Sequence, residues 1–389
     1  MFDANGLPKD FKIPTTMPDG SPFDISKLTN GTANTQQIQM QMDPVQQAKR
    51  HFDHSNKYKG LPSMKPLTIC VTTYNRPDNL KKALDNLIDI QENPTLFNIL
   101  VIDDCSDVKD SYDELLKEYE KYDYIKYIRL NKNGGPGVAR QTGINNCKTR
   151  WICFMDDDDF IGKNINYIIK TELYQDNFEL IRTPFMELNG ETITPVREDI
   201  SYNHGKIFNM DMIRKYYIHF PEFRVFEDVY FNLSYFFLAE YHKKVKDCKD
   251  SFYGYLENKE SITRKQGINF MENNFKDYCR ARLEPAKLLL RKYPKSYEVL
   301  RVHFMNVIAD EYLFIQLFKY RKSDRIDEYM KLVKDDYKYI CKKLKFSGDD
   351  LSRMIRGNNE TYSKVLKDFH SRFEFEESED IHKFISKIV

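Results

Sequence analysis

Between residues 67 and 155, short apolar runs alternate with amphipathic helical segments, and this alternation limits the possible folds more than any other pattern in the chain. The apolar runs are rich in β-branched and aromatic side chains, which is typical of buried strands. Repeated strand–helix–strand units predict a mostly parallel, doubly wound α/β sheet with flanking helices and right-handed crossovers. The expected strands are 67–73, 97–102, 124–130 and 151–155, and the expected helices are one beginning at Pro77, one over 112–122 and one over 138–146.

The pattern changes after residue 160. Asn189-Gly190 separates two short apolar runs and is a strong hairpin signal. From about residue 266 to the end, apolar residues recur at helical spacing with Lys and Arg outside. Other expected elements are helices over 163–174 and 210–217, a helix opened by 220–231 that runs to about 242, and strands over 178–183, over 206–209 and from residue 244.

We therefore expect three parts. Residues 1–60 are rich in polar residues, Pro and Gly, and are expected to form a flexible or surface-draped arm, with an oligomerisation arm as the alternative. Residues 61–265 form the α/β domain. Residues 266–389 form a helical region, which either only packs on the sheet or also contacts an anionic acceptor, a partner or a membrane surface.

Composition narrows the class of protein. The formal net charge of +1 provides no overall field for nucleic acid or a membrane. The seven cysteines form no Cys-x-x-Cys pair, which favours reduced thiols over disulfides or a zinc site. The N-terminus lacks a signal-peptide core, and no run approaches the roughly 20 apolar residues that a spanning helix needs. We expect a cytoplasmic protein, with peripheral membrane contact as an alternative.

Four consecutive carboxylates, Asp156 to Asp159, follow the run 151–155. Like charges in a row repel one another, so the arrangement is costly without a compensating cation. A hard divalent metal that also carries phosphate oxygens supplies that charge. The alternative is a solvated acidic turn or a helix N-terminus.

Two further clusters follow strand ends that a doubly wound sheet brings to the same crevice. Asp103 and Asp104 can accept hydrogen bonds from a base N–H or a ribose hydroxyl, or can form an Asx turn instead. Gly134 to Gly137 open a helix whose N–H groups can hold phosphate, and Arg140 adds a positive charge. The alternative for the glycines is an ordinary turn.

Glu227 and Asp228 lie at a predicted helix start, after aromatic residues. One of these carboxylates could act as a general base if the fold turns it toward the crevice. The alternative is a pair of acidic residues that stabilise the helix dipole.

Taken in order, these segments resemble family 2 glycosyltransferases, which have the GT-A fold. The resemblance covers roughly residues 65–265 and implies an inverting, metal-dependent enzyme of the hexosyltransferase type. The segments that carry it are Val71-Thr-Thr-Tyr-Asn-Arg-Pro, Val101-Ile-Asp-Asp-Cys-Ser, Gly134-Gly-Pro-Gly-Val-Ala-Arg, Phe154-Met-Asp-Asp-Asp-Asp, Phe226-Glu-Asp-Val-Tyr-Phe, with Gly205-Lys-Ile-Phe and Tyr253-Gly-Tyr around the last.

The resemblance also implies roles for single residues. Asp158, with Asp156, would bind Mn²⁺ or Mg²⁺, and Asp159 would orient the motif. Asp228 would be the catalytic base, with Glu227 as its neighbour. The nucleotide diphosphate would be bound by Thr73, Tyr74, Arg76, Asp103, Asp104, Gly135, Arg140, Asp156 and Asp157.

The sequence departs from the family pattern at several positions. Cys105 stands where the family usually has Gly, and Asp157 lengthens the acidic run. The absence of a Gln-x-x-Arg-Trp motif argues against a processive synthase. His204 and His242 are candidates for a third metal ligand, and Arg264 is a candidate phosphate contact.

The predicted function is transfer of a sugar from a nucleotide sugar, most simply a UDP-sugar, to an acceptor hydroxyl on a surface glycan or glycolipid. One alternative is glycosylation of a modified base in nucleic acid, and another is a non-catalytic nucleotide-sugar-binding subunit. Lipid-linked acceptors and homo-oligomer formation also remain open. A nucleotidyltransferase is disfavoured because 74–77 lacks a Gly-rich basic loop.

Overall fold

The computed structural model describes residues 65–91, 96–174, 177–189, 192–197, 199–223, 225–256, 267–348 and 380–388, with single residues 353, 363, 366, 367 and 369. The expected arm over 1–60 and the candidate Arg264 lie outside the described residues. The chain divides into two compact units, which we call the sheet unit (Met1–Arg224 with His242–Asn258) and the helical unit (Val225–Tyr241 with Lys259–Val389).

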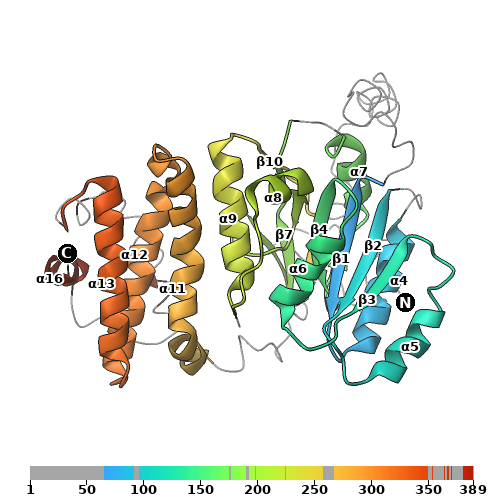
Figure 1. Ribbon diagram of the computed structural model, residues 1–389, viewed down its shortest axis with the longest axis horizontal. Coiled ribbons are helices and arrows are strands. Elements are labelled where there is room, and N and C mark those ends of the chain that lie inside the picture. The colour runs from blue at the N-terminus through green and yellow to red at the C-terminus, as the bar shows by residue number, and fades with distance from the viewer. Residues whose placement is uncertain are drawn as a thin grey trace. The chain divides into compact units, whose positions relative to one another are not determined.

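The sheet unit is built on a seven-stranded sheet in the order β10-β6-β9-β4-β1-β2-β3 (Figure 1). Neighbours among β1 to β4 are parallel, which confirms the mostly parallel, doubly wound expectation. The exception is β9, which runs antiparallel to both β4 and β6. The strands are β1 (Leu67–Thr73), β2 (Phe97–Asp103), β3 (Ile125–Arg129), β4 (Trp151–Asp156), β6 (Leu180–Arg182), β9 (Lys206–Asn209) and β10 (Val245–Asp247).

Helices cover both faces of this sheet (Figure 1). Leu67, Ile69 and Val71 of β1 pack in one core with α4 (Pro77–Ile90) and α5 (Lys109–Lys117). The alternate residue Cys70 meets α6 (Pro136–Asn146) on the opposite face. Successive side chains of a strand point to opposite faces of the sheet, so alternate residues of β1 pack against the helices on opposite faces.

Some element ends differ from the sequence prediction. Helix α5 ends at Lys117, five residues before the expected Tyr122, and residues 118–121 form a turn. Helix α7 (Asn164–Thr171) is likewise shorter than expected, and α8 spans Met210–Tyr216. Element ends are the least specified feature of such patterns because the last turn frays.

A second, four-stranded sheet has the order β5-β11-β7-β8. Strands β7 and β8 pair antiparallel in the expected hairpin. β11 pairs parallel with β7 and antiparallel with β5. The strands are β5 (Phe160–Ile161), β7 (Phe185–Asn189), β8 (Thr192–Val196) and β11 (Tyr253–Leu256).

The helical unit confirms the helical C-terminal region. It also contains α9, which the sequence pattern placed in the α/β domain. Helix α9 is apolar on most of its surface, so it needs partners on several sides, and within this unit it packs on α11 and α12. The helices are α9 (Glu227–Tyr241), α11 (Gly267–Lys292), α12 (Tyr297–Tyr320), α13 (Ile326–Leu344) and α16 (Ile381–Ile388). In the described part of the chain, none of the helices has the length and apolar character needed to cross a bilayer.

Candidate active site

Three neighbouring strands end at one edge of the large sheet. Thr73 at the end of β1 is opposite Asp103 at the end of β2, and Thr72 is opposite Asp156 at the end of β4. The Oγ1 atom of Thr72 donates to Oδ1 of Asp156 over 3.2 Å. The predicted crevice residues that follow β1, β2 and β4 are therefore brought together by the parallel register.

Arg140 is the cation nearest to Asp156. Its side chain is buried in α6, and Nη2 donates to Oδ1 of Asp156 over 2.8 Å. Burial is the largest influence and opposes ionisation of this carboxyl, but the charge and hydrogen bond of Arg140, with contributions from His204 and Thr72, together lower the pKa of Asp156. Asp156 is therefore an ionised carboxylate held against a guanidinium.

Arg76 neutralises the next two carboxylates. Its Nη1 donates to Oδ2 of Asp158 over 2.7 Å, and its Nη2 lies 3.0 Å from Oδ1 of Asp157. Asp157 is buried, whereas the side chain of Asp158 is 22% exposed. Burial raises the pKa of Asp157 to about 7 despite the nearby Arg76. Of the two, Asp158 is thus the carboxylate that a ligand could reach.

Asp159 is directed toward the second sheet. Its Oδ2 accepts from the Tyr253 hydroxyl over 2.6 Å, and its Oδ1 accepts from Leu256 N over 3.0 Å. The Nε2 atom of His204 lies 3.8 Å from Oδ2. Burial first, then the Asp156 charge, raises the pKa of Asp159 well above its usual value.

Within the described residues, one group could hold a metal ion: Asp156, Asp159 and His204, whose ligand atoms all lie within 4.8 Å of one another. Burial lowers the pKa of His204 to about 4, so its imidazole is neutral and able to ligate at pH 7. Carboxylate oxygens with one imidazole suit a divalent ion such as Mn²⁺. The other candidate, His242, hydrogen-bonds Glu179 and Tyr216.

The glycine-rich loop is held by Asp104. The two oxygens of this carboxylate accept from Gly134 N over 2.8 Å and from Gly135 N over 2.7 Å. Burial raises the pKa of Asp104, against the effect of these two bonds. Gly135 has a φ of +83°, which only glycine adopts without strain, and directly precedes α6. Asp104 thus joins the loop after β2 to the helix N-terminus where we expect phosphate.

Three predicted residues remain to be described. Tyr74 is exposed, and its hydroxyl donates to Oδ2 of Asp107 over 3.3 Å. Glu227 and Asp228 occupy the first turn of α9 in the helical unit, with Glu227 buried and Asp228 partly exposed. The assignment of Asp228 as base, like that of Asp158 as metal ligand, stays a prediction.

Two residues of the site were not predicted. The Tyr112 hydroxyl lies 2.7 Å from Thr73 Oγ1 and accepts from Arg76 N over 3.0 Å. Arg129, at the end of β3, donates to Asp103 over 2.8 Å. In the sequence, Tyr112 reads as a core aromatic residue and Arg129 as a charged strand end, so neither carries a local signal.

Comparison with known proteins agrees with this geometry. Residues 68–178 match the model for Glycosyl transferase family 2. The poly(ribitol-phosphate) beta-glucosyltransferase of Bacillus spizizenii is 28% identical over 208 residues, which are 49% of this chain and 32% of that protein. Poly(ribitol-phosphate) beta-N-acetylglucosaminyltransferase TarS of Staphylococcus aureus is 24% identical over 213 residues, covering 51% and 36%. The chain spans about a third of the length of these curated relatives.

The solved structures give the fold. The crystal structure of S. aureus TarS 1–349 has a TM-score of 0.51 at 18% identity and covers 78% of this chain and 92% of that chain. The same fragment in complex with UDP-GlcNAc also gives a TM-score of 0.51, at 19% identity. Residues 68–178 therefore carry the sequence pattern of glycosyl transferase family 2, and the sheet unit has the GT-A fold.

Proposed function

We propose that this protein is a metal-dependent, inverting glycosyltransferase that moves a sugar from a UDP-sugar to an acceptor hydroxyl. The observation that supports it most is the meeting of three strand ends in a family 2 domain, where the acidic run lies beside Arg76 and Arg140. Two guanidiniums next to carboxylates provide charges of both signs. A diphosphate and a cation can each bind such a site.

The residues at this edge fit a divalent cation. Asp156 and Asp158 would hold it by the resemblance, and His204 and Asp159 offer further donors close to Asp156. An imidazole donor favours Mn²⁺ over Mg²⁺, which prefers oxygen ligands alone. When bound, such an ion takes up negative charge on the departing diphosphate. Arg140 and the N-terminus of α6 would bind the phosphate oxygens.

The proposed reaction needs one base. The carboxylate of Asp228 would take the proton of the acceptor hydroxyl. The acceptor oxygen forms a bond to the anomeric carbon on the face opposite the diphosphate. The bond between the anomeric carbon and the diphosphate oxygen breaks, and its electron pair leaves with UDP. This single displacement inverts the anomeric centre and requires no covalent enzyme intermediate.

The relatives suggest the acceptor. Two of them are named for transfer to poly(ribitol-phosphate), one with glucose and one with N-acetylglucosamine. We infer that the acceptor is a hydroxyl of a phosphodiester-linked polyol of this type. Because the two relatives differ in sugar, the sugar is best identified with a panel of UDP-sugars.

The test incubates the protein with a panel of UDP-sugars and one of three acceptors: poly(ribitol phosphate), poly(glycerol phosphate) or DNA containing hydroxymethylated bases. Each reaction is run with Mn²⁺ and with EDTA, and UDP release and sugar incorporation are measured. We expect UDP release and sugar incorporation with a polyol phosphate and Mn²⁺. Asp228→Asn should retain UDP binding and lose transfer by about a hundredfold or more, because it removes the base. Asp250→Asn, at an exposed carboxylate of the sheet unit, is the matched control.

Near-normal transfer by Asp228→Asn would show that another group is the base. UDP binding without transfer or hydrolysis for every donor would support the non-catalytic binder instead. Equal activity in Mn²⁺ and EDTA would contradict the metal requirement.

A further inference from the structure

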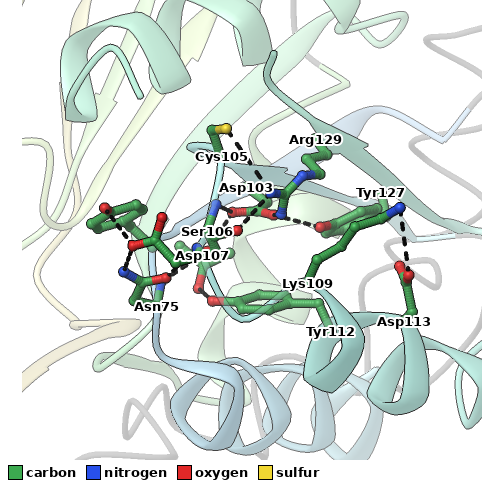
Figure 2. Close-up of polar contacts among 12 residues, drawn as sticks. Asn75, Asp103, Cys105, Ser106, Asp107, Lys109, Tyr112, Asp113, Tyr127 and Arg129 are labelled. Carbon is green, nitrogen blue, oxygen red and sulfur yellow. Dashed lines mark hydrogen bonds and ion pairs between the residues drawn. The ribbon is translucent and has the colours of Figure 1, made fainter. Parts of the chain in front are cut away.

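Asp103 has no acceptor capacity left for a ligand. Its side chain is fully buried at the end of β2 (Figure 2). Oδ1 accepts from Ser106 N over 2.9 Å and from Ser106 Oγ over 2.5 Å. Oδ2 accepts from the Tyr127 hydroxyl over 2.6 Å and from Arg129 Nη1 over 2.8 Å. A carboxylate offers about four lone-pair sites, and donors from this chain fill all of them.

Arg129 connects that carboxylate to the turn that follows it. While Nη1 binds Asp103, Nη2 donates to the carbonyl oxygen of Ser106 over 2.5 Å and lies 3.9 Å from Cys105 Sγ. The guanidinium therefore contacts both ends of the turn 103–106 through its two amino groups (Figure 2). Lysine could match the charge of arginine but not this fork of donors.

The turn requires such support because its backbone is strained. Cys105 has a φ of +61°, in the left-handed region that glycine adopts freely and other residues adopt at a cost. The bonds from Arg129 and Asp103 to Ser106 fix the residues on either side of Cys105. They therefore hold a conformation that the local sequence does not favour.

The turn 103–106 and the next residue, Asp107, are also hydrogen-bonded to the loop after β1. Asn75 N donates to Ser106 Oγ over 2.8 Å. Asn75 Nδ2 donates to Asp107 Oδ2 over 2.9 Å, and Asp107 N donates to Asn75 Oδ1 over 2.7 Å. Hydrogen bonds thus run from Arg129 to the segment that carries Tyr74 and Arg76 (Figure 2).

We propose that Arg129 is a positioning residue for the nucleotide site and that Asp103 acts with it rather than as a nucleotide ligand. Together they hold the turn 103–106, with Asp107, against the loop 73–76. Thr73, Tyr74 and Arg76 therefore have a fixed place at the sheet edge. This inference rests on the proposed function, because it assumes that the edge binds a nucleotide diphosphate.

The first test measures UDP affinity by calorimetry for the full chain, Arg129→Gln, Arg129→Lys and Cys105→Gly, with Mn²⁺ present. We expect Arg129→Gln to weaken UDP binding by about tenfold, the size of effect seen for a lost charged hydrogen bond. Arg129→Lys should recover only part of the affinity. Adding Cys105→Gly to Arg129→Gln should recover most of it, because glycine adopts the turn without the support. Lys126→Gln, at an exposed position of the same strand, is the matched control.

Unchanged UDP affinity in Arg129→Gln would overturn the proposal. A loss of UDP affinity that Cys105→Gly does not recover would also overturn it, because a general loss of stability would not be reversed by one glycine in this turn.

Hydrogen exchange measured without nucleotide tests this inference independently of the proposed function. In Arg129→Gln, the amides of Asn75, Ser106 and Asp107 should exchange about tenfold faster or more than in the unaltered chain. If the unaltered chain binds no nucleotide, the proposed function fails, and unchanged exchange would refute the Arg129 link on its own.

Discussion

At the scale of single residues, the acidic run is held by two arginines, Arg76 from the loop after β1 and Arg140 from α6. Arg140 forms an ion pair with Asp156, and Arg76 forms ion pairs with both Asp157 and Asp158. Adjacent carboxylates at the end of a strand would otherwise repel one another and oppose folding. These arginines offset part of the negative charge of the acidic run, so a metal ion that binds at Asp158, as predicted, would have to compete with Arg76.

Arg76→Gln should therefore bind Mn²⁺ several-fold more tightly than the unaltered chain when no nucleotide is present, because one competing positive charge is removed. Asp158→Ala should bind Mn²⁺ more weakly. Free Mn²⁺ measured by electron paramagnetic resonance in a titration gives both affinities. Lys121→Gln, an equal charge change at an exposed turn, is the control. If Arg76→Gln and Lys121→Gln had the same Mn²⁺ affinity, competition by Arg76 would be excluded.

At the scale of elements, the contact of α6 with β1 decides how Arg140 reaches Asp156. Gly143 in the middle of α6 faces β1, and a Cβ atom there would lie 2.3 Å from the Sγ atom of Cys70. The glycine is thus required by the close approach of helix and strand rather than by a turn. Arg140, one turn earlier in α6, depends on the same spacing.

Gly143→Ala should lower the free energy of unfolding by about 1–3 kcal/mol, although alanine has the higher helix propensity, because the added methyl overpacks the contact with Cys70. Urea unfolding measures the change. In the double variant Cys70→Ala/Gly143→Ala, the loss should be clearly smaller than the sum of the two single losses. Strict additivity would mean that the two side chains do not meet.

At the scale of the whole molecule, each of the two units buries carboxyl groups whose pKa is raised. The helical unit encloses Glu311, which is 1% exposed in α12 near Asp336 of α13. Burial first, then the Asp336 charge, raises the pKa of Glu311 well above its usual value. When the pKa of a carboxyl is higher in the folded chain than in the unfolded chain, its contribution to stability is most favourable below the pKa of the unfolded chain. That contribution is lost as the pH rises through the pKa of the folded chain. Glu311 therefore costs stability at neutral and alkaline pH.

Glu311→Gln should raise the free energy of unfolding at pH 8 by at least about 1 kcal/mol, since a tenfold change in an ionisation constant corresponds to about 1.4 kcal/mol. The gain should be smaller at pH 5, because the raised pKa means that less of Glu311 is ionised in the folded chain there. Urea unfolding of the full chain at both pH values tests this. Asp335→Asn, on the exposed side of α13, should change little at either pH. An equal gain at both pH values for Glu311→Gln would show that ionisation of Glu311 is not the cause.

The parallel strands β1 to β4, the hairpin after them and the edge at which the polar clusters meet could all be predicted from the order of the residues. These features follow from short-range periodicity and from the geometry of parallel strands, which local residue order sets. The groups that partner the acidic run and Asp103 could not be predicted in this way, because they depend on the packing of distant segments. Arg76 and Asp158 are 82 positions apart, and Tyr253 and Asp159 are 94 apart, so their contacts depend on how loops from separate strands pack. The same holds for the antiparallel placement of β9 and for the grouping of α9 with the helical unit, because long-range packing leaves no local periodic signal.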